Sequence, residues 1–177
     1  WKHITPCGTS KEDASKYMAI GTAKTESEKK INIDRGYLRI VGAIMYAMVY
    51  TRPDIAFHTS RLASLMQSPS NEAYEAALGL VKYLHHTRLD GITFGGKLHA
   101  VNDGVRMSVP RAWSDSAFGG ETRPMGGGYV EIDDGPAAWI SRALKFTPLN
   151  TCEAEWAQLV AMAKELIFTA NIEEDMT

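Results

Sequence analysis

Two carboxylates on separate predicted elements could carry chemistry in this chain. Asp115 lies inside a run patterned as a strand, residues 111–118, where aspartate is depleted and needs a reason. Glu155 lies near the start of a helical run, at the edge of its apolar face, where a carboxylate is unfavourable unless it is paired or binds a cation. Simpler interpretations stay open: a water-facing aspartate at a strand edge, and two acids, Glu153 and Glu155, favoured by the helix dipole.

A group of basic side chains ends an earlier helical run. Lys82, His85, His86 and Arg88 could contact a phosphate backbone through their charge and hydrogen-bond donors. Cations at a helix C-terminus are also favoured by the helix dipole, and this structural interpretation is the preferred one. Lys82, His86 and Arg88 are therefore candidate nucleic-acid contacts beside a structural alternative.

Helical periodicity dominates the segment before residue 91. Residues 36–50 carry apolar side chains three and four apart, and 51–54 combine a helix stop with a proline suited to a new first turn. Two further helical runs follow, separated by the breaker sequence at 68–71. Three helices with short connections predict an antiparallel bundle over 36–90, whereas the polar residues 1–35 are expected to be loosely ordered.

Strand patterns replace helical ones after Gly91. A short strand is expected at 91–94, another at 111–118, and a hairpin whose strands, 128–132 and 136–141, flank the turn sequence at 133–135. Asn150 and Thr151 offer a cap for a last helix. Its apolar face, expected to pack on the sheet, comprises Cys152, Leu159, Val160, Ala163, Leu166 and Ile167. The predicted fold class is α+β, a helical bundle followed by a three-stranded antiparallel sheet with one helix.

Composition is that of an ordinary globular protein, with 45% hydrophobic and 23% charged residues in a chain of 177. The longest apolar stretch is too short to span a bilayer, so no membrane association is expected. Two distant cysteines, Cys7 and Cys152, predict neither a disulfide framework nor a zinc site, which favours a reduced intracellular setting without secretion. Residues 1–96 hold 12 Lys/Arg against 9 Asp/Glu, and residues 97–177 hold 7 against 12. This split fits a basic nucleic-acid-facing module joined to an acidic one, and equally ordinary surface variation.

Four motifs follow one another along the chain. They are YLRIVGAIMY with TRPDIA at 37–56, WSDSAFGG at 113–120, GGGYV with AWIS at 126–141, and NTCEAEW with AMAKE at 150–165. In the same order and with similar spacing, they resemble motifs of the polyproteins of copia-type LTR retrotransposons. The resemblance covers most of the chain.

The resemblance implies a layout and a chemistry. Residues 36–90 would form a thumb-like segment of a reverse transcriptase, 91–110 a connector, and 111–177 an incomplete ribonuclease H-like domain. Asp115 and Glu155 would be catalytic ligands of Mg²⁺ or Mn²⁺ in the hydrolysis of RNA in RNA–DNA hybrids. The implied partners are the hybrid and the remainder of the polyprotein, in a cytoplasmic particle or the nucleus.

Such hydrolysis needs the attacking water and the leaving oxygen stabilised together, which two Mg²⁺ ions held by carboxylates achieve. The chain departs from the family at this site. Ala117 replaces the second aspartate of the family motif, Phe118 replaces its tryptophan, and the family's further acidic motifs and polymerase Y-x-D-D motif are absent. We therefore expect weak or no nuclease activity. The alternative function is a non-catalytic remnant that binds nucleic acid or a partner.

Overall fold

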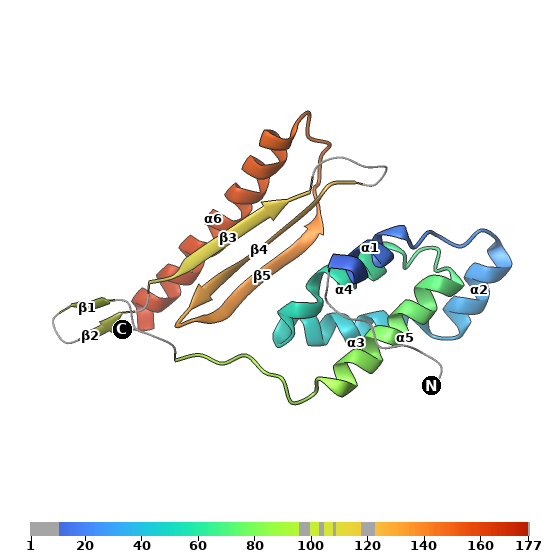
Figure 1. Ribbon diagram of the computed structural model, residues 1–177, viewed down its shortest axis with the longest axis horizontal. Helices are drawn as coiled ribbons and strands as arrows, with labels where there is room; N and C mark the ends of the chain where they lie inside the picture. The colour runs from blue at the N-terminus through green and yellow to red at the C-terminus, as the bar shows by residue number, and fades with distance from the viewer. Residues whose placement is uncertain (1–10, 96–99, 103–104, 108, 118–122, 177) are drawn as a thin grey trace. The chain divides into compact units, whose positions relative to one another are not determined.

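The computed structural model describes residues 11–95, 100–102, 105–107, 109–117 and 123–176. The chain divides into two compact units, Trp1–Gly91 and Ile92–Thr177 (Figure 1). The first unit contains α1 (Lys11–Ala19), α2 (Glu26–Asp34), α3 (Tyr37–Tyr50), the short 3-10 helix η1 (Pro53–Ile55), α4 (Ala56–Ser64) and α5 (Asn71–His86). The second contains β1 (Ala100–Asn102), β2 (Val105–Met107), β3 (Arg111–Ser116), β4 (Met125–Ile132), β5 (Gly135–Ala143) and α6 (Thr151–Met176).

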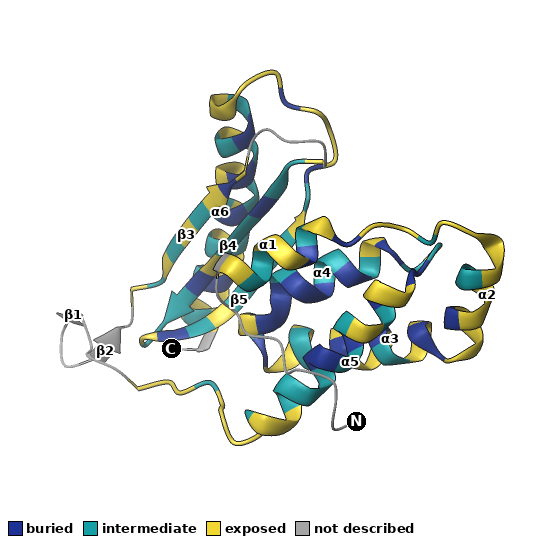
Figure 2. Ribbon diagram, turned by 45° about the vertical axis from the view of Figure 1, so that its right-hand side comes forward, coloured by how far each residue is buried: buried dark blue, intermediate teal, exposed yellow. Residues whose placement is uncertain are grey.

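The core of the first unit lies between α3, α4 and α5, as the helical periodicity predicts. Its members are apolar side chains with almost no exposed surface, among them Val41, Ile44, Leu62 and Leu80. Buried positions line the inner sides of these helices in Figure 2. Tyr37 is fully buried and donates its hydroxyl hydrogen to the carbonyl oxygen of Leu62 at 2.9 Å. Burial raises the pKa of this phenol, so Tyr37 stays neutral.

The TRPD sequence has a structural role in this unit. Arg52 is 8% exposed, and its guanidinium donates to both carboxylate oxygens of Asp54, at 2.9 and 2.6 Å. The same guanidinium reaches the carbonyl and hydroxyl oxygens of Thr87, at 3.1 and 2.7 Å, and so ties the end of α5 to the η1 turn. Burial opposes ionisation of Asp54, but hydrogen bonds from Arg52 and Tyr83 outweigh it and lower its pKa.

The expectation of a loosely ordered segment over residues 1–35 is wrong for its described part, residues 11–35. These form α1 and α2, and Tyr17 of α1 and Ile20 just after it belong to the core, at 5% and 8% exposed. Fully buried Asn32 donates to the carbonyl oxygens of Glu28 and Pro69, which joins α2 to the start of α5. The spacing of apolar residues did not predict these helices, because α1 and α2 are mostly polar and few of their side chains enter the core.

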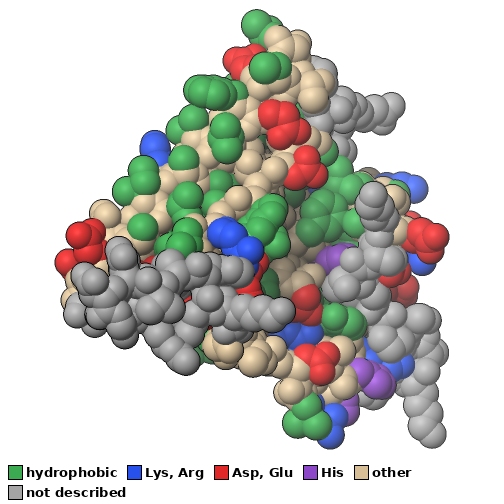
Figure 3. Space-filling view, turned by 60° about the vertical axis from the view of Figure 1, so that its left-hand side comes forward, with side chains coloured by type: hydrophobic (Ala, Val, Ile, Leu, Met, Phe, Trp, Pro, Cys, Tyr) green, Lys and Arg blue, Asp and Glu red, His purple; other side chains and the backbone are tan. Residues whose placement is uncertain are grey.

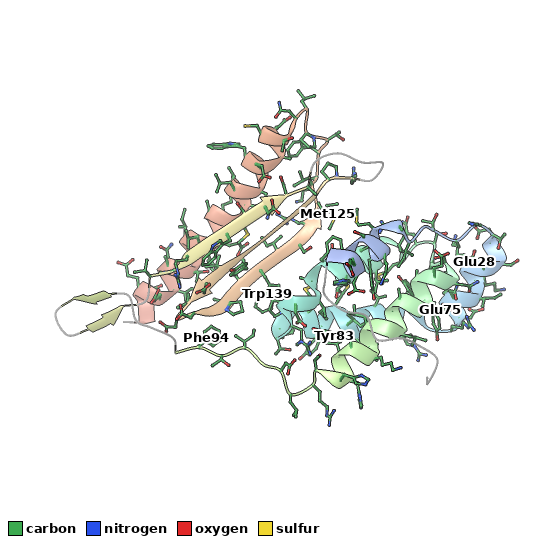
Figure 4. All side chains as sticks on the ribbon, in the orientation of Figure 1. Glu28, Glu75, Tyr83, Phe94, Met125 and Trp139 are labelled. Atoms are coloured by element: carbon green, nitrogen blue, oxygen red, sulfur yellow. The ribbon has the colours of Figure 1, made fainter. Side chains whose placement is uncertain are left out.

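An open antiparallel sheet of order β3-β4-β5 forms the second unit, beside the small β1-β2 hairpin. Asp133 and Asp134 both have positive φ, 51° and 59°, as a two-residue type I′ turn between β4 and β5 requires. The expected hairpin is thus confirmed, with longer strands. The expected strand at 91–94 does not form, but this segment packs on the turn, where Phe94 lies against Gly135 (Figure 4). The expected end of the first strand, Phe118, lies outside the described residues.

The last helix packs on one face of this sheet, but with a different side from the one expected. Its contacts are mainly with β3 and β4, and its buried residues are Ala154, Gln158, Met162 and Thr169. Most of the expected apolar face is turned outward instead, with Leu159 and Ile167 at 49% and 61% exposed, whereas Ala163 and Leu166 are half-buried. The reason lies in β4, where glycines leave gaps: a Cβ at Gly126 would overlap Gln158, and one at Gly128 would meet Met162.

The fold class is therefore α+β, as predicted, with a helical unit followed by an open sheet that carries one helix. Among the described helices, none has both the length and the apolar character needed to cross a membrane.

Candidate carboxylate site and nucleic-acid contacts

Asp115 lies near the end of β3, on the face of the sheet that α6 does not cover. It pairs with Gly127 of β4, and its neighbours Ser114 and Ser116 pair with Gly128 and Gly126. Gly126 and Gly128 face α6, whereas a Cβ at Gly127 would meet only the carbonyl oxygen of Ile140. Side chains opposite each other in a sheet share a face and alternate along the strand. The exposed carboxylate of Asp115 therefore points away from the helix.

Aromatic residues share this uncovered face with Asp115. Trp113 stacks on Tyr129 with ring centroids 4.8 Å apart, and both side chains are about two-fifths exposed, at 41% and 39%. Arg111 lies 5.6 Å from the Trp113 ring centroid, and its guanidinium is held by Glu131 and Asp134, each at 2.8 Å. The aromatic pair is thus the nearer neighbour of Asp115 on this face, and the ion-paired Arg111 lies four residues away, at the other end of β3.

Glu155 lies in the second turn of α6 and is half-buried. The acid two residues earlier, Glu153, stabilises the start of the helix, in agreement with the structural interpretation offered for it from the sequence. Its carboxylate accepts from the backbone N–H of Leu149 at 2.6 Å, and its own N–H donates to the side-chain oxygen of Asn150 at 2.9 Å. Asn150 is therefore the cap that was predicted, and the Glu153 carboxylate accepts from the N–H one residue before the cap rather than from the N–H of Asn150 itself, as it would in a capping box.

The structure does not bring Asp115 and Glu155 onto one side of the sheet. Glu155 belongs to the helix that covers one face, and Asp115 projects from the other. Within the described part of the chain, no three Asp, Glu, His or Cys side chains gather closely enough to hold a metal ion. The described residues therefore do not fit the Mg²⁺ or Mn²⁺ centre that the family resemblance implies.

Two buried polar side chains between α6 and the sheet were not predicted from the sequence. Ser116 is 8% exposed and Gln158 is 1% exposed, and both border Gly126. The Ser116 hydroxyl and the Gln158 amide nitrogen have no hydrogen-bond partner among the described residues. The sequence held no signal for this pair, because a glutamine in a helix pattern is normally assigned to the water-facing side.

The basic side chains at the end of α5 contact its last carbonyl groups. His86 Nδ1 lies 2.7 Å from the carbonyl oxygen of Lys82, and Arg88 donates to the carbonyl oxygen of His85 at 3.1 Å. This arrangement agrees with the preferred structural interpretation, since unsatisfied carbonyls at a helix C-terminus attract donors and cations. His86 and Arg88 remain exposed, and binding of nucleic acid by Lys82, His86 and Arg88 stays a prediction.

Comparison with known proteins identifies the class to which the chain is related. Curated relatives aligned with 77–86% of the chain are retrovirus-related Pol polyproteins of transposons. The resemblance to the polyproteins of copia-type retrotransposons is thereby confirmed.

The individual relatives differ in how much of their own length is matched. The polyprotein from transposon TNT 1-94 of Nicotiana tabacum is 30% identical over 156 residues, 86% of this chain but 11% of that protein. The polyprotein from transposon RE2 of Arabidopsis thaliana is 28% identical over 139 residues, 77% of this chain and 9% of its own length. The chain thus spans about a tenth of these polyproteins. The secreted RxLR effector protein 161 of Plasmopara viticola is 29% identical over 133 residues, 75% of this chain and 89% of that protein. No family model and no solved structure matches the chain.

Proposed function

We propose that this chain is the thumb-like and ribonuclease H-like portion of a retrotransposon Pol polyprotein, and that it binds nucleic acid or polyprotein partners without cleaving RNA. The activity of the parent enzyme would be metal-dependent hydrolysis of RNA in RNA–DNA hybrids. In the non-catalytic role, the chain would retain the helical unit and the helix-covered sheet of the parent enzyme but not its nuclease activity.

The placement of the two carboxylates is the observation that carries this proposal. A two-metal site needs its ligands within a few ångströms of ions that are roughly 3.5–4 Å apart. Asp115 and Glu155 project on different sides of the sheet, and Ala117 offers no oxygen ligand from its side chain. The exposed basic side chains that end α5 are the best candidates for contacts with phosphates.

The effector relative supports a role outside catalysis by a complete polyprotein. The matched region makes up 89% of that protein, whereas it makes up about a tenth of the Pol relatives. A stretch of this extent therefore occurs in a protein that lacks most of the polyprotein.

The first test is cleavage of a labelled RNA–DNA hybrid in Mg²⁺ or Mn²⁺ by the wild-type chain, Asp115→Asn and Glu155→Gln. We expect all three proteins to leave the hybrid intact. Cleavage by the wild type that either substitution abolishes would overturn the non-catalytic proposal and restore the two carboxylates as ligands.

The second test is binding of the same hybrid, followed by fluorescence anisotropy over a range of NaCl concentrations. We expect affinity to fall with salt and to fall further in a Lys82→Gln, Arg88→Gln double variant, because each phosphate contact releases counterions. A Lys24→Gln, Lys30→Gln double variant is the matched control, since it removes the same number of charges from two exposed lysines in the region of α2. Equal affinities of the two double variants would refute the contact role of α5.

A further inference from the structure

The ring of His58 is buried where α1 packs on α4 in the first unit. It is 2% exposed, and the ring of Tyr17 on α1 stands nearly perpendicular to it, with ring centroids 4.6 Å apart. Phe57 lies beside it, with ring centroids 5.5 Å apart. Neither ring nitrogen of His58 has a hydrogen-bond partner among the described residues. These surroundings suit the neutral imidazole, because a charged ring without an acceptor is unfavourable away from water.

The negative charges that act on this ring do not compensate for its burial. Asp13 of α1 and Asp54 of η1 both favour protonation of His58. Each carboxylate also has a cationic neighbour, since Asp13 lies 3.4 Å from the Lys16 ammonium and Asp54 lies 2.6 Å from the Arg52 guanidinium. Burial outweighs the two carboxylates and lowers the pKa of His58 below the ordinary 6.5. The folded protein therefore keeps this ring neutral at pH values where a solvated histidine is already charged.

The other elements packed on α4 bring phenols and a cation to this region. Tyr37 of α3 and Tyr83 of α5 are phenols, which are neutral near pH 7, and each hydroxyl donates to an oxygen of another residue. Arg61, one turn after His58 on α4, donates to carbonyl oxygens at the end of α1. Neither the phenols nor the guanidinium supplies negative charge for a protonated ring.

The first helix is joined to the bundle by a buried tyrosine and by polar contacts. Among the described side chains of α1, only Tyr17 is buried, and its hydroxyl donates to the carbonyl oxygen of Ala76 at 3.0 Å. By contrast, α3 buries Tyr37, Val41 and Ile44. A segment with few buried apolar contacts opens locally at a lower free energy than the whole unit unfolds. Local opening of α1 would expose the ring of His58 while α3 stays folded.

We propose that α1 is an acid-sensitive latch on the helical bundle, which opens when His58 takes up a proton. While α1 is docked, the imidazolium would be buried against Tyr17 and Phe57, and once α1 is open, water solvates it. Acid therefore shifts α1 toward the open form below about pH 6.5, where a solvated histidine becomes charged. Because one proton is involved, the opening constant rises by at most about tenfold per pH unit. The latch lies within the helical unit, so the inference does not depend on nucleic-acid binding.

The other described histidines are outside this coupling. His85 and His86, at the end of α5, are exposed. Histidine surface appears as small purple areas in Figure 3. Both rings contact water whether α1 is docked or open, so their protonation favours neither form. His85 therefore provides a matched control for His58.

The test is hydrogen exchange of the complete chain at about pH 7 and about pH 5.5, followed by mass spectrometry. Dividing each rate by the intrinsic rate at the same pH gives protection factors for α1, α2 and α3. We expect α1 to be at least roughly tenfold less protected than α3, because it opens locally. Its protection should fall roughly three- to eightfold between the two pH values. Local opening of α2 leaves His58 buried, so the protection of α2 should not fall in this way.

The matched variants are His58→Phe and His85→Phe. Phenylalanine keeps an aromatic ring at position 58 but takes up no proton. We expect α1 of His58→Phe to be equally protected at the two pH values. In His85→Phe, α1 should respond to pH as it does in the wild type.

Three results would overturn the proposal. Equal protection of α1 and α3 would mean that α1 opens only when the whole unit unfolds. A wild-type α1 whose protection does not fall with pH would show that its opening leaves His58 buried. An undiminished fall in His58→Phe would assign the pH dependence to another group. The first two results come from the wild type alone, and far-ultraviolet circular dichroism shows whether each variant retains the fold.

Discussion

Gly128 is the position in the sheet where adding a single methyl group should destabilise the second unit most clearly. A Cβ at this residue would overlap the carbonyl oxygen of Trp113 and lie 2.6 Å from Met162 Cγ. The Met162 side chain can rotate, but the Trp113 carbonyl belongs to the neighbouring strand and cannot move without disturbing the β3-β4 pairing. Gly128→Ala therefore forces strain into the sheet or lifts α6 away from it.

The adjacent Gly127 provides a control in the same strand. A Cβ there would have the carbonyl oxygen of Ile140 as its nearest contact, at an ordinary 3.6 Å. Both Gly→Ala changes restrict the unfolded chain similarly, which stabilises the protein by about 0.4–1 kcal/mol. The difference between the two variants is therefore the overpacking term, about 2–3 kcal/mol at the upper part of its usual range.

Tryptophan fluorescence during thermal or urea unfolding measures this difference. Three of the four tryptophans, Trp113, Trp139 and Trp156, belong to the second unit, so the signal reports mainly on the sheet and α6. For a unit of this size, each kcal/mol shifts the midpoint by about 4–8 °C. Gly128→Ala should thus melt about 8–24 °C below Gly127→Ala. Equal midpoints would refute the close approach of α6 to β4 and the assignment of the helix faces derived from it.

Three further predictions concern buried polar groups, each read as the midpoint of urea unfolding. Gly126→Ala should be destabilising in the wild type and close to neutral in a Gln158→Ala background, because the added Cβ overlaps the Gln158 side chain. Equal effects in both backgrounds would contradict the close contact between Gly126 and Gln158. His58 is 2% exposed with no hydrogen-bond partner for either ring nitrogen among the described residues, and burial lowers its pKa below the ordinary 6.5. Below about pH 6.5 this histidine therefore takes up a proton in the unfolded chain before it does so in the folded protein. Its protonation should lower the free energy of unfolding of the wild type by at most about 1.4 kcal/mol per pH unit. His58→Leu should lack this contribution to the loss of stability at low pH. Asp54→Ala should cost about 2–3 kcal/mol because it leaves the buried guanidinium of Arg52 without its carboxylate; a change under about 0.5 kcal/mol would show that the pair contributes little.

Local patterns in the sequence predicted the elements whose residues face one core. The helices over 37–86 and the α6 cap at Asn150 follow from apolar spacing and capping residues, and both signals act over a few neighbouring residues. The turn at Asp133 and Asp134 is equally local, because positive φ at two successive residues suits that sequence. The α1 and α2 helices were missed since their burial depends on contacts such as Asn32 with Pro69, 37 residues away.

The candidate site illustrates the limit of such patterns. The sequence identified Asp115 and Glu155 as carboxylates on a strand and a helix, and it related both to one family motif set. Whether two carboxylates meet depends on strand register and on which side of a helix packs, and neither is a local property.

The sequence by itself thus determined the α+β class, the family resemblance and most helix and strand positions, because these depend on short-range periodicity and capping. Only the tertiary structure decided which face of α6 is buried. The glycines of β4 accept Gln158 and Met162, so the more apolar face stays in water and Asp115 projects from the opposite side of the sheet. A one-residue change of strand register would reverse that last result, since successive side chains of a strand point to opposite faces.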